Sequence, residues 1–325
     1  MIPEKIRAAR NRTLTLSESD IEFFSKRLKT LSRPASRCDV ENQIFCQDLF
    51  DILDFLPVSC VDLLILDPPY NLTKSFNGRV FSARSTAEYM AYLESWLPKL
   101  LKTLKPTASV YLCADWRISA AVQLVLEKYL IVRNRITWER EKGRGARKNW
   151  KNCSEDIWFA TVSHEYTFNA EAVKLKRRVL APYREKGMPK DWQQTAHGNF
   201  RLTAPSNLWS DITVPFWSMP ENTDHPTQKP EKLIAKLLLA SSNEGDLVLD
   251  PFLGSGTTAV VAKKLHRRFF GIEIDRLYGC LAAKRLALAA HDKTIQGYAD
   301  GVFWERNTLH AQVRSRAFQL QQISI

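Results

Sequence analysis

The sequence predicts an α/β protein built on a doubly wound, mostly parallel sheet. Short apolar runs alternate along the chain with longer segments whose apolar residues recur at helical spacing, which is typical of such a fold. Two of these runs, at residues 63–66 and 247–249, lead directly into Asp followed by Pro. The second then continues through a glycine-rich turn into a helical segment, as in units that bind nucleotides. At 325 residues the chain is long enough for a full α/β core and an added module.

The first half of the chain begins with a basic segment, residues 1–37, in which one helix is expected from residue 19 to near residue 31. The elements then expected are strand 43–48, strand 61–66, helix 86–104, strand 109–114, helix 118–129, and two antiparallel edge strands at 131–140 and 157–163. Residues 71–86 are expected to form a loop, because Asn77-Gly78 is a turn signal.

The second half begins with residues 164–222, the least regular stretch of the chain. Pro230-Glu231 then predicts a helix start, since proline is favoured at the beginning of helices. Strand 247–250, a helix from residue 259 to near residue 265, and strand 268–273 follow. Strands that alternate with helices in this way indicate parallel pairing.

Asp67-Pro68-Pro69-Tyr70 ends the apolar strand 61–66. Proline lacks a backbone donor and fixes φ, so the pair stops the strand and stiffens the loop. Open α/β sheets bind ligands at this end of their strands. The loop would present a carboxylate, free carbonyls and a flat ring, the groups that hold a planar nitrogenous base by its amino group. The alternative is a proline turn with Tyr70 packed in the core.

A second motif joins the strand that ends at Asp250 to the next helix through Gly254 and Gly256. Glycine lets the backbone turn tightly and approach a ligand, and a helix start offers free N–H groups and partial positive charge. Glu273 follows Asp250 by 23 residues, close to the spacing at which nucleotide-binding units place an acid on ribose hydroxyls. A purely structural turn is the alternative.

With these motifs the chain resembles the amino-methyltransferases that use S-adenosylmethionine to methylate exocyclic amines of DNA bases. DPPY at 67–70 and DPFLGSGTT at 250–258 carry the resemblance, and HPTQKP at 225–230 supports it. The DPPY form is most similar to adenine-N6 enzymes, and a catalytic motif before the cofactor motif is the order of the permuted beta class. The resemblance covers residues 40–290 and implies a circularly permuted, Rossmann-like methyltransferase fold with an inserted DNA-recognition region.

The resemblance assigns catalysis to the first motif. Asp67 and the Pro68 carbonyl would accept hydrogen bonds from the amine of the target base, and Tyr70 would stack on the base. Pro69 would keep the loop rigid. A base inside a duplex cannot reach such a loop, so base flipping is implied.

The resemblance also supplies a cofactor site. The residues expected to bind S-adenosylmethionine are Asp48, Leu49, His225, Thr227, Lys229, Asp250, Phe252, Gly254, Ser255, Gly256, Thr257 and Glu273. Glu273 would hold the ribose hydroxyls, Asp48 would lie near the adenine, and Lys229 would neutralise the methionine carboxylate. For residues 225–230 the alternative is a capped turn before a helix.

Five regions follow from the same resemblance. They are a basic N-terminal extension (1–37), a catalytic half (38–163), a target-recognition region (164–222), a cofactor-binding half (223–295) and a C-terminal tail (296–325). The target-recognition region mixes basic, amide and aromatic residues, which suits the reading of base edges. The aromatic and imidazole side chains in question are Tyr166, Tyr183, Trp192, His197, Trp209, Phe216 and Trp217, and for each of them plain packing is the alternative.

The net charge of +12 is concentrated in two blocks. Residues 133–203 hold sixteen Lys and Arg against eight Asp and Glu, and residues 1–37 hold nine against four. Because both blocks flank the expected base-binding loop, neutralisation of DNA phosphates is favoured over a merely solvated surface. In loop 141–150, Arg144, Arg147 and Lys148 are the expected DNA-binding residues, with a solvated loop as the alternative.

Composition excludes other classes. No apolar run approaches the length of about 18 residues that a membrane span needs, and no signal peptide is visible, so a cytoplasmic protein is expected. The cysteines show no paired metal spacing, none follows Pro as a cytosine-C5 nucleophile would, and they are expected to be reduced and mostly buried. They are Cys38, Cys46, Cys60, Cys113, Cys153 and Cys280.

The sequence as a whole predicts a sequence-specific adenine-N6 methyltransferase of double-stranded DNA, in a restriction-modification or epigenetic context. One alternative is a cytosine-N4 enzyme, although these more often carry Ser at the position of Asp67. Another is a non-catalytic DNA-binding module, and an RNA or protein amine as substrate is a more distant one. A partner restriction endonuclease for the same site, and a monomer or a homodimer, are left open.

Overall fold

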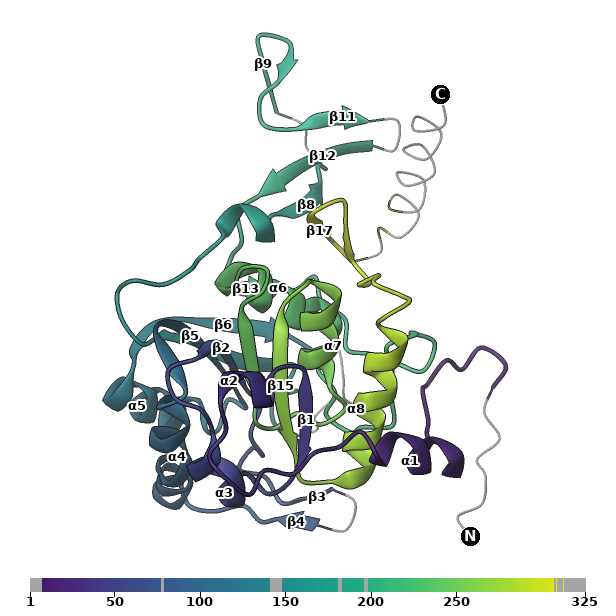
Figure 1. Cartoon of the computed structure of the whole chain (residues 1–325). Helices are drawn as coiled ribbons and strands as arrows, with labels where there is room; N and C mark the ends of the chain where they lie inside the picture. Colours follow the sequence, from purple (N-terminus) through teal and green to yellow (C-terminus); the bar gives the residue numbers. More distant parts are fainter. Residues whose placement is uncertain are drawn as a thin grey trace.

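A computed structural model of the chain describes residues 8–76, 79–140, 148–180, 183–195, 198–306, 308 and 312. It shows one large sheet flanked by helices and a smaller sheet that projects beyond it (Figure 1). The large sheet holds, in order, β1 (Gln43–Cys46), β15 (Arg268–Glu273), β14 (Leu247–Asp250), β2 (Val61–Leu66), β5 (Leu104–Ala114), β7 (Ser154–Thr161), β6 (Ile131–Glu139) and β13 (Leu208–Trp209). This arrangement confirms the predicted α/β class.

Neighbouring strands of this sheet pair in parallel, except that β7 runs antiparallel to both β5 and β6. The expected antiparallel pairing of 131–140 with 157–163 is therefore present. The prediction that both strands lie at the sheet edge is wrong, because β7 lies inside the sheet and β13 adds a further strand beyond β6. A strand of two residues is too short to be predicted from periodicity.

Helices cover both faces of the large sheet. One face packs on α6 (Glu231–Ser241), α7 (Thr257–Lys264) and α8 (Arg276–Leu288), and the other on α3 (Leu49–Ile52), η1 (Leu53–Phe55), α4 (Thr86–Leu101) and α5 (Ser119–Tyr129). The alternating side chains of β2 join both cores: Leu63 and Ile65 enter the first, and Leu64 and Leu66 enter the second. A continuous apolar run is what a strand buried on both faces requires.

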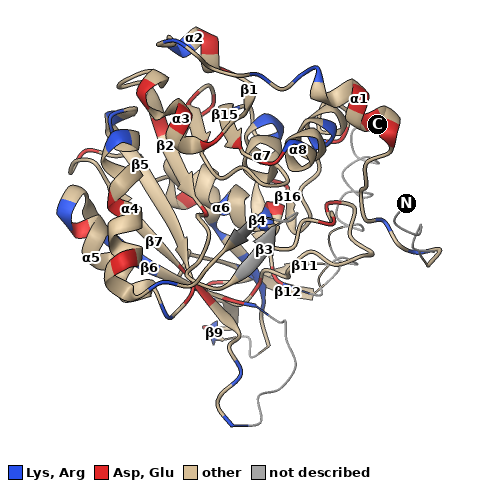
Figure 2. Cartoon of the chain, turned by 90° about the horizontal axis from the view of Figure 1, so that it is seen from below, with Lys and Arg blue, Asp and Glu red and all other residues tan. Residues whose placement is uncertain are grey.

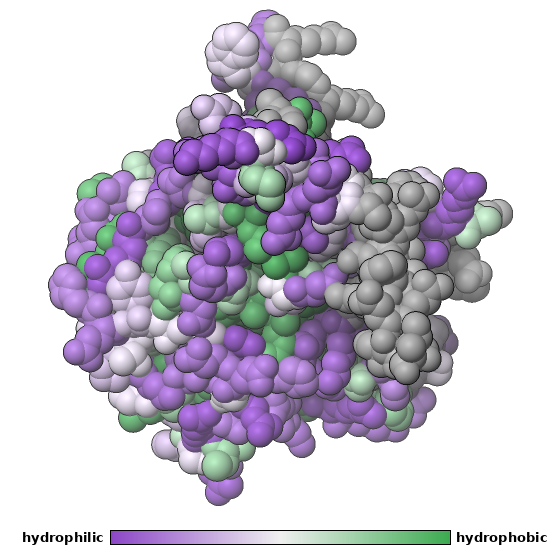
Figure 3. Space-filling view, turned by 90° about the horizontal axis from the view of Figure 1, so that it is seen from above, coloured by the Kyte–Doolittle hydropathy of each residue, from purple (hydrophilic) through white to green (hydrophobic). Residues whose placement is uncertain are grey.

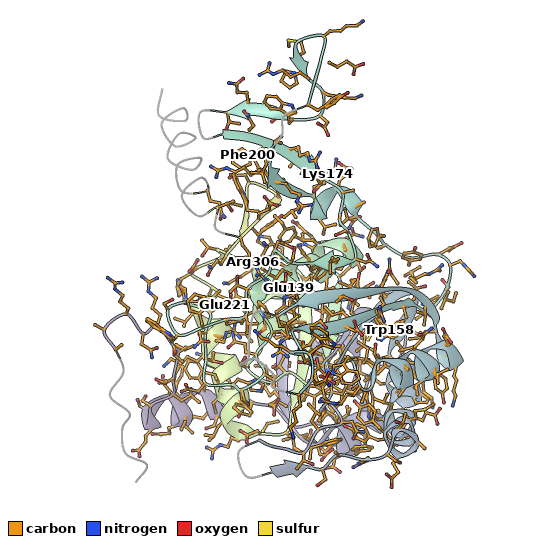
Figure 4. The ribbon with its side chains drawn as sticks, turned by 180° about the vertical axis from the view of Figure 1, so that it is seen from behind. Glu139, Trp158, Lys174, Phe200, Glu221 and Arg306 are labelled. Carbon is orange, nitrogen blue, oxygen red and sulfur yellow. The ribbon has the colours of Figure 1, made fainter. Side chains whose placement is uncertain are left out.

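The smaller sheet has the order β11 (Gln193–Thr195), β12 (Gly198–Thr203), β8 (Leu175–Arg178), β17 (Val302–Trp304) and β16 (Tyr298–Ala299). The short η2 (Ala170–Val173) precedes it, and β9 (Arg184–Glu185) pairs with β10 (Met188–Pro189) in a separate hairpin. Phe200, labelled in Figure 4, packs edge-on against Trp304 with ring centroids 5.7 Å apart. The separate tail expected at 296–325 is thus wrong for residues 298–304, which complete the sheet formed by residues 175–203.

Residues 8–37 also belong to the main body. α1 (Glu18–Ser25) begins at a capping box, in which the Ser17 hydroxyl accepts from the Asp20 N–H at 3.1 Å and the Asp20 carboxylate accepts from the Ser17 N–H at 2.8 Å. The helix ends at Ser25, earlier than expected, and Phe24 is buried in the core beneath α6, α7 and α8. The chain then continues to a single helical turn, α2 (Arg37–Val40).

Other expected boundaries shift. The expected loop 71–86 contains a hairpin of β3 (Lys74–Phe76) and β4 (Arg79–Phe81), and Asn77 and Gly78 lie outside the described residues. Cys60, Cys113 and Cys280 are buried, but Cys38 and Cys153 are exposed, so burial of the thiols is less general than expected. Within the described residues, no helix combines the length and apolar character needed to cross a bilayer. Seen from above, the surface is mainly hydrophilic, with hydrophobic residues gathered near the middle (Figure 3).

Candidate active site

Strands from the two halves of the chain meet at the centre of the large sheet. β2 pairs with β14 in parallel, with Leu63 opposite Val248 and Leu64 opposite Leu249. Because both strands run in the same direction, Asp67 just past β2 and Asp250 at the end of β14 lie at the same edge of the sheet. The fold therefore brings together the two motifs that the sequence singled out.

The loop from Asp67 to Tyr70 is held from two sides. The Tyr89 hydroxyl of α4 donates a hydrogen bond to the Pro69 carbonyl at 3.1 Å. The Lys229 ammonium donates to both carboxylate oxygens of Asp67, at 2.8 and 2.7 Å, and to the Tyr70 hydroxyl at 3.2 Å. Lys229 was expected to face a cofactor carboxylate. The structure shows its ammonium on the expected catalytic carboxylate, and its role toward a cofactor stays a prediction.

The charge states of this cluster are set by burial and by its carboxylates. Burial alone would lower the pKa of Lys229, but the negative charges of Asp67 and Glu155 outweigh this effect and raise the pKa above its usual value. Burial, reinforced by the same two carboxylates, raises the pKa of Tyr70 well above its usual value. At neutral pH, Lys229 is therefore a cation and Tyr70 a neutral phenol.

Glu155 is a member of the cluster that was not expected from the sequence. One of its carboxylate oxygens lies 3.4 Å from the Lys229 ammonium and 3.4 Å from the Tyr70 hydroxyl. Its other oxygen pairs with Arg140, which comes directly after β6. Glu155 is buried on β7. The strand begins Ser154-Glu155-Asp156, so nothing in the local sequence distinguishes Glu155 from the carboxylate beside it.

Gly254 and Gly256 shape the turn after β14. Both have left-handed backbone angles, with φ of +53° and +81°. A Cβ on Gly254 would lie 2.9 Å from Nε2 of His225, and a Cβ on Gly256 would lie 2.6 Å from the Cβ of Ala282. Both the backbone conformation and the space at these positions therefore require glycine.

Two buried carboxyl groups flank this turn. Asp250 accepts hydrogen bonds from the Thr258 hydroxyl at 2.6 Å and the Phe252 N–H at 3.0 Å. Glu273 accepts from the Gly254 N–H at 2.7 Å and the Asp275 N–H at 2.8 Å. Burial raises the pKa of Asp250 and of Glu273 to about 7, although these hydrogen bonds act in the opposite direction. Both groups therefore titrate near neutral pH.

A buried network ties the glycine turn to the segment that precedes α6. The Thr257 hydroxyl donates to the Lys229 carbonyl at 3.1 Å. Arg285 donates to the Ser255 carbonyl and to the Thr257 hydroxyl, each at 3.0 Å, and pairs with Glu231 at 3.0 Å. Glu231 is the first residue of α6, which confirms the predicted helix start.

Nine of the predicted site residues line one cavity between these loops. They are Asp67, His225, Thr227, Lys229, Asp250, Phe252, Gly254, Ser255 and Thr257. The cavity has a volume of about 30 Å³, enough for a water molecule but not for a nucleoside.

Asp48 and Leu49 are not part of this lining. The Asp48 side chain accepts from the Phe50 N–H at 2.9 Å and so caps α3, while Leu49 is buried in the core. The backbone nevertheless brings Asp48 near Glu273, because Gln47 N–H donates to the Glu273 carbonyl at 3.1 Å.

The strand β6, which precedes the expected DNA-binding loop, ends at the same edge of the sheet as Asp67, because β6 runs parallel to β2. Arg144 and Arg147 lie outside the described residues, and Lys148 is exposed.

The expected base-reading aromatic residues divide into two groups. Trp192 and Trp209 are buried, which supports plain packing for them, and Tyr166 packs edge-on against Phe159 with centroids 5.9 Å apart. The exposed residues are Tyr183, Phe216 and Trp217. His197 lies outside the described residues.

Comparison with known proteins agrees with this geometry. A family model for N6 and N4 methyltransferases, described as DNA methylase, matches residues 61–284. Type II methyltransferase M.HpaI of Haemophilus parainfluenzae is 32% identical over 250 residues, which cover 76% of this chain and 74% of that protein. DNA adenine methyltransferase YhdJ of Escherichia coli (strain K12) is 33% identical over 243 residues, covering 73% of this chain and 79% of that protein.

Solved structures show the same fold. The M1.HpyAVI–SAM complex aligns with a TM-score of 0.52 at 26% identity, over 75% of this chain and 98% of that one. The cytosine-N4-specific PvuII DNA methyltransferase aligns with a TM-score of 0.56 at 17% identity, over 82% and 91% respectively. The matched family model spans both motifs and the strands that hold them. The chain belongs to the DNA methylase family of N6 and N4 amino-methyltransferases.

Proposed function

We propose that this protein transfers a methyl group from S-adenosylmethionine to the exocyclic N6 amine of a flipped adenine in double-stranded DNA. The observation that carries the proposal is the meeting of Asp67 with the turn of Gly254 and Gly256 at adjacent strand ends. Two similar proteins agree with it: YhdJ of Escherichia coli is named a DNA adenine methyltransferase, and M1.HpyAVI was solved in complex with SAM.

The residues around the glycine turn suit S-adenosylmethionine by their chemistry. Its ribose hydroxyls need an acceptor, and Glu273 offers carboxylate oxygens beside the turn. The N–H groups at the start of α7 and the absence of a Cβ at Gly254 suit close approach of a ligand to the backbone. Its methionine carboxylate needs a cation, and Lys229 lies in the same cavity. When bound, this cofactor supplies an activated methyl group.

The chemistry of the first motif follows from the electronic structure of the base. An exocyclic amine conjugates with its ring and is a poor nucleophile. Asp67 would accept one hydrogen bond from the amine and the Pro68 carbonyl a second, which localises the lone pair on nitrogen and aims it at the methyl group. The neutral Tyr70 ring would stack on the extruded base. Correct alignment of the reacting atoms would supply much of the acceleration.

The position of Lys229 adds one step to this scheme. Its ammonium occupies both oxygens of Asp67, so at least one oxygen has to be released before Asp67 can accept the amine. Glu155 offers the ammonium an alternative partner at 3.4 Å, and the carboxylate of an incoming cofactor would be a further one. A shift of the ammonium from Asp67 toward Glu155 would free an oxygen of Asp67 for the base.

We assign target recognition to the smaller sheet and its hairpin, including β16 and β17. Their exposed basic side chains suit phosphate contacts and base-edge contacts. These residues are Arg177, Arg178, Arg184, Lys186, Lys190 and Arg201. The type II relatives are consistent with a cognate endonuclease that cuts the same sequence.

The direct test uses the whole protein, labelled S-adenosylmethionine and unmethylated genomic DNA. The DNA is digested and its nucleosides are identified by mass spectrometry. N6-methyladenine is the expected product. N4-methylcytosine would retain the fold and overturn the assignment of the base, and the absence of any methylated base despite cofactor binding would overturn DNA as the substrate.

A further inference from the structure

A large cleft lies away from the proposed active site, at the amino-terminal ends of strands. It has a volume of about 910 Å³, and its lining includes Gln43 of β1, Gly245 just before β14 and Arg268 of β15. Glu273, at the other end of β15, belongs to the proposed cofactor site. A six-residue strand separates its two ends by roughly 17 Å, so the cleft and the active site occupy opposite edges of the sheet.

The lining of the cleft is strongly basic. It includes Lys26, Arg27, Lys29, Lys263, His266, Arg267 and Arg268. None of the described residues that line it is Asp or Glu. The segment between α1 and α2 and the helices α7 and α8 carry Lys and Arg on one side of the molecule, coloured blue in Figure 2. Such a concentration of one sign in a concave site attracts and focuses anions.

Nearby carboxylates compensate only part of this charge. Glu22 lies 3.2 Å from Lys26, with both side chains largely exposed, and such surface pairs are weak. Burial lowers the pKa of Arg267, and the negative charges of Glu244 and Asp246 act in the opposite direction. Lys29 and Arg268 are exposed, and neither belongs to an ion pair identified among the described residues.

The walls of the cleft are fixed by hydrogen bonds. The backbone of Lys29 lies along β1, since its N–H donates to the Ile44 carbonyl and its carbonyl accepts from the Cys46 N–H, each at 2.8 Å. Buried Arg267 donates to the Ser242 carbonyl at 2.8 Å and to the Leu265 carbonyl at 2.6 Å. These bonds fix the backbone at Lys29 and the guanidinium of Arg267, whereas the Lys29 side chain is exposed.

The same cleft has an apolar part. Its lining includes Ile44, Phe269, Ala283, Leu286 and Ala287. Its volume lies within the range of about 300–1,000 Å³ that is typical of small-molecule sites. A ligand that satisfies both parts combines several negative charges with a planar or apolar body.

We propose that this cleft binds a small molecule with two or more phosphate groups on a planar body, such as a nucleoside diphosphate or triphosphate. A duplex presents its phosphates on a convex surface, which matches a concave cleft less well than a free polyphosphate does. The N-terminal basic block, expected from the sequence to neutralise DNA phosphates, supplies three of the cations here: Lys26, Arg27 and Lys29. The proposal does not depend on which base the enzyme methylates.

The test is calorimetric titration of the full chain with ATP, ADP and inorganic triphosphate. Saturating S-adenosylhomocysteine keeps the proposed cofactor site filled, so that adenine nucleotides report on the cleft alone. The cleft variant is Lys29→Gln with Arg268→Gln. The control variant is Lys99→Gln with Lys102→Gln, which removes the same charge from the end of α4. Thermal melting checks that both variants fold.

We expect ATP and ADP to bind with an affinity that falls as salt rises, and triphosphate alone to bind more weakly. The cleft variant should lose at least tenfold in ATP affinity while the control variant and the methylation of DNA stay unchanged. Failure of the wild-type protein to bind ATP or ADP at low salt would overturn the proposal. So would equal ATP affinity in the cleft variant, or loss of DNA affinity in that variant with ATP binding intact, which would assign the cleft to DNA.

Discussion

The ammonium of Lys229 lies 2.7 and 2.8 Å from the two carboxylate oxygens of Asp67. Residues from the two halves of the chain thus form an ion pair at the point where the proposed reaction takes place. Lys229 is buried, and Asp67 retains partial exposure. The pair links the catalytic motif to the cofactor motif.

Removal of the Lys229 charge should weaken cofactor binding. If the ammonium transfers from Asp67 to the methionine carboxylate, Lys229→Met should raise the dissociation constant of S-adenosylmethionine at least about tenfold, equivalent to about 1.4 kcal/mol. Lys229→Arg keeps the charge and should recover part of the affinity. Equilibrium binding in the absence of DNA measures both. Wild-type affinity in the Met variant would show that Lys229 serves Asp67 alone.

Gly256→Ala should damage the cofactor turn more than a left-handed glycine elsewhere in the chain. The left-handed backbone costs about 1–2 kcal/mol in any L-residue, and the contact of 2.6 Å with Ala282 adds overpacking of about 1–3 kcal/mol. Gly301→Ala is the matched control, because Gly301 has φ of +73° and no atom within 4 Å of its added Cβ.

Chemical denaturation should therefore show the larger loss of unfolding free energy in Gly256→Ala. Cofactor affinity should fall in that variant only. Equal losses of stability in the two variants would contradict the close packing of the glycine turn against α8.

Cofactor affinity should rise with pH through neutrality. Burial raises the pKa of Glu273 to about 7, and its ionised form is the better acceptor for ribose hydroxyls. Cofactor binding should therefore strengthen between pH 6 and 8, and Glu273→Gln should remove this increase. Asp250→Asn is the comparison, because Asp250 is the other carboxyl group that titrates in this range. A step that persists unchanged in Glu273→Gln would contradict the ribose assignment.

The same pKa has a consequence for stability. The folded-state pKa of Glu273 lies above the ordinary value of 4.5, so the folded protein binds the proton more tightly than the unfolded chain does. The contribution of this group is complete below pH 4.5 and is lost as pH rises to about 7. In Glu273→Gln, the free energy of unfolding should decline less over this range.

The basic loop should contribute to DNA affinity through phosphates. The triple replacement by Ala of Arg144, Arg147 and Lys148 should weaken DNA binding. It should also lower the slope of log Kd against log salt by about 0.9 for each phosphate that the loop no longer neutralises. Replacement of Lys99, Lys102 and Lys128 by Ala removes the same charge from α4 and α5 and serves as the control. An unchanged salt slope in the loop variant would assign the loop to solvent.

The features of the fold and the site that depend on local sequence pattern could be predicted from the sequence. Strand ends at Asp67 and Asp250 were visible in the residues, and adjacency of β2 and β14 then placed both at one edge. Glu155 was not visible, because its role depends on the pairing of β7 with β5 and β6, which no local pattern reveals. Two other features could not be predicted for the same reason, because each joins segments that are distant in sequence. They are the pairing of β17 with β8 and the basic cleft.

The most direct test of the central claim compares Asp67→Ala with the wild-type protein in a single turnover on unmethylated DNA. Both proteins are loaded with labelled S-adenosylmethionine, and cofactor binding is measured on the same samples. The predicted result is loss of N6-methyladenine formation in Asp67→Ala while cofactor binding remains measurable. Transfer at the wild-type rate in this variant would contradict the account, because the amine would then need no acceptor at Asp67.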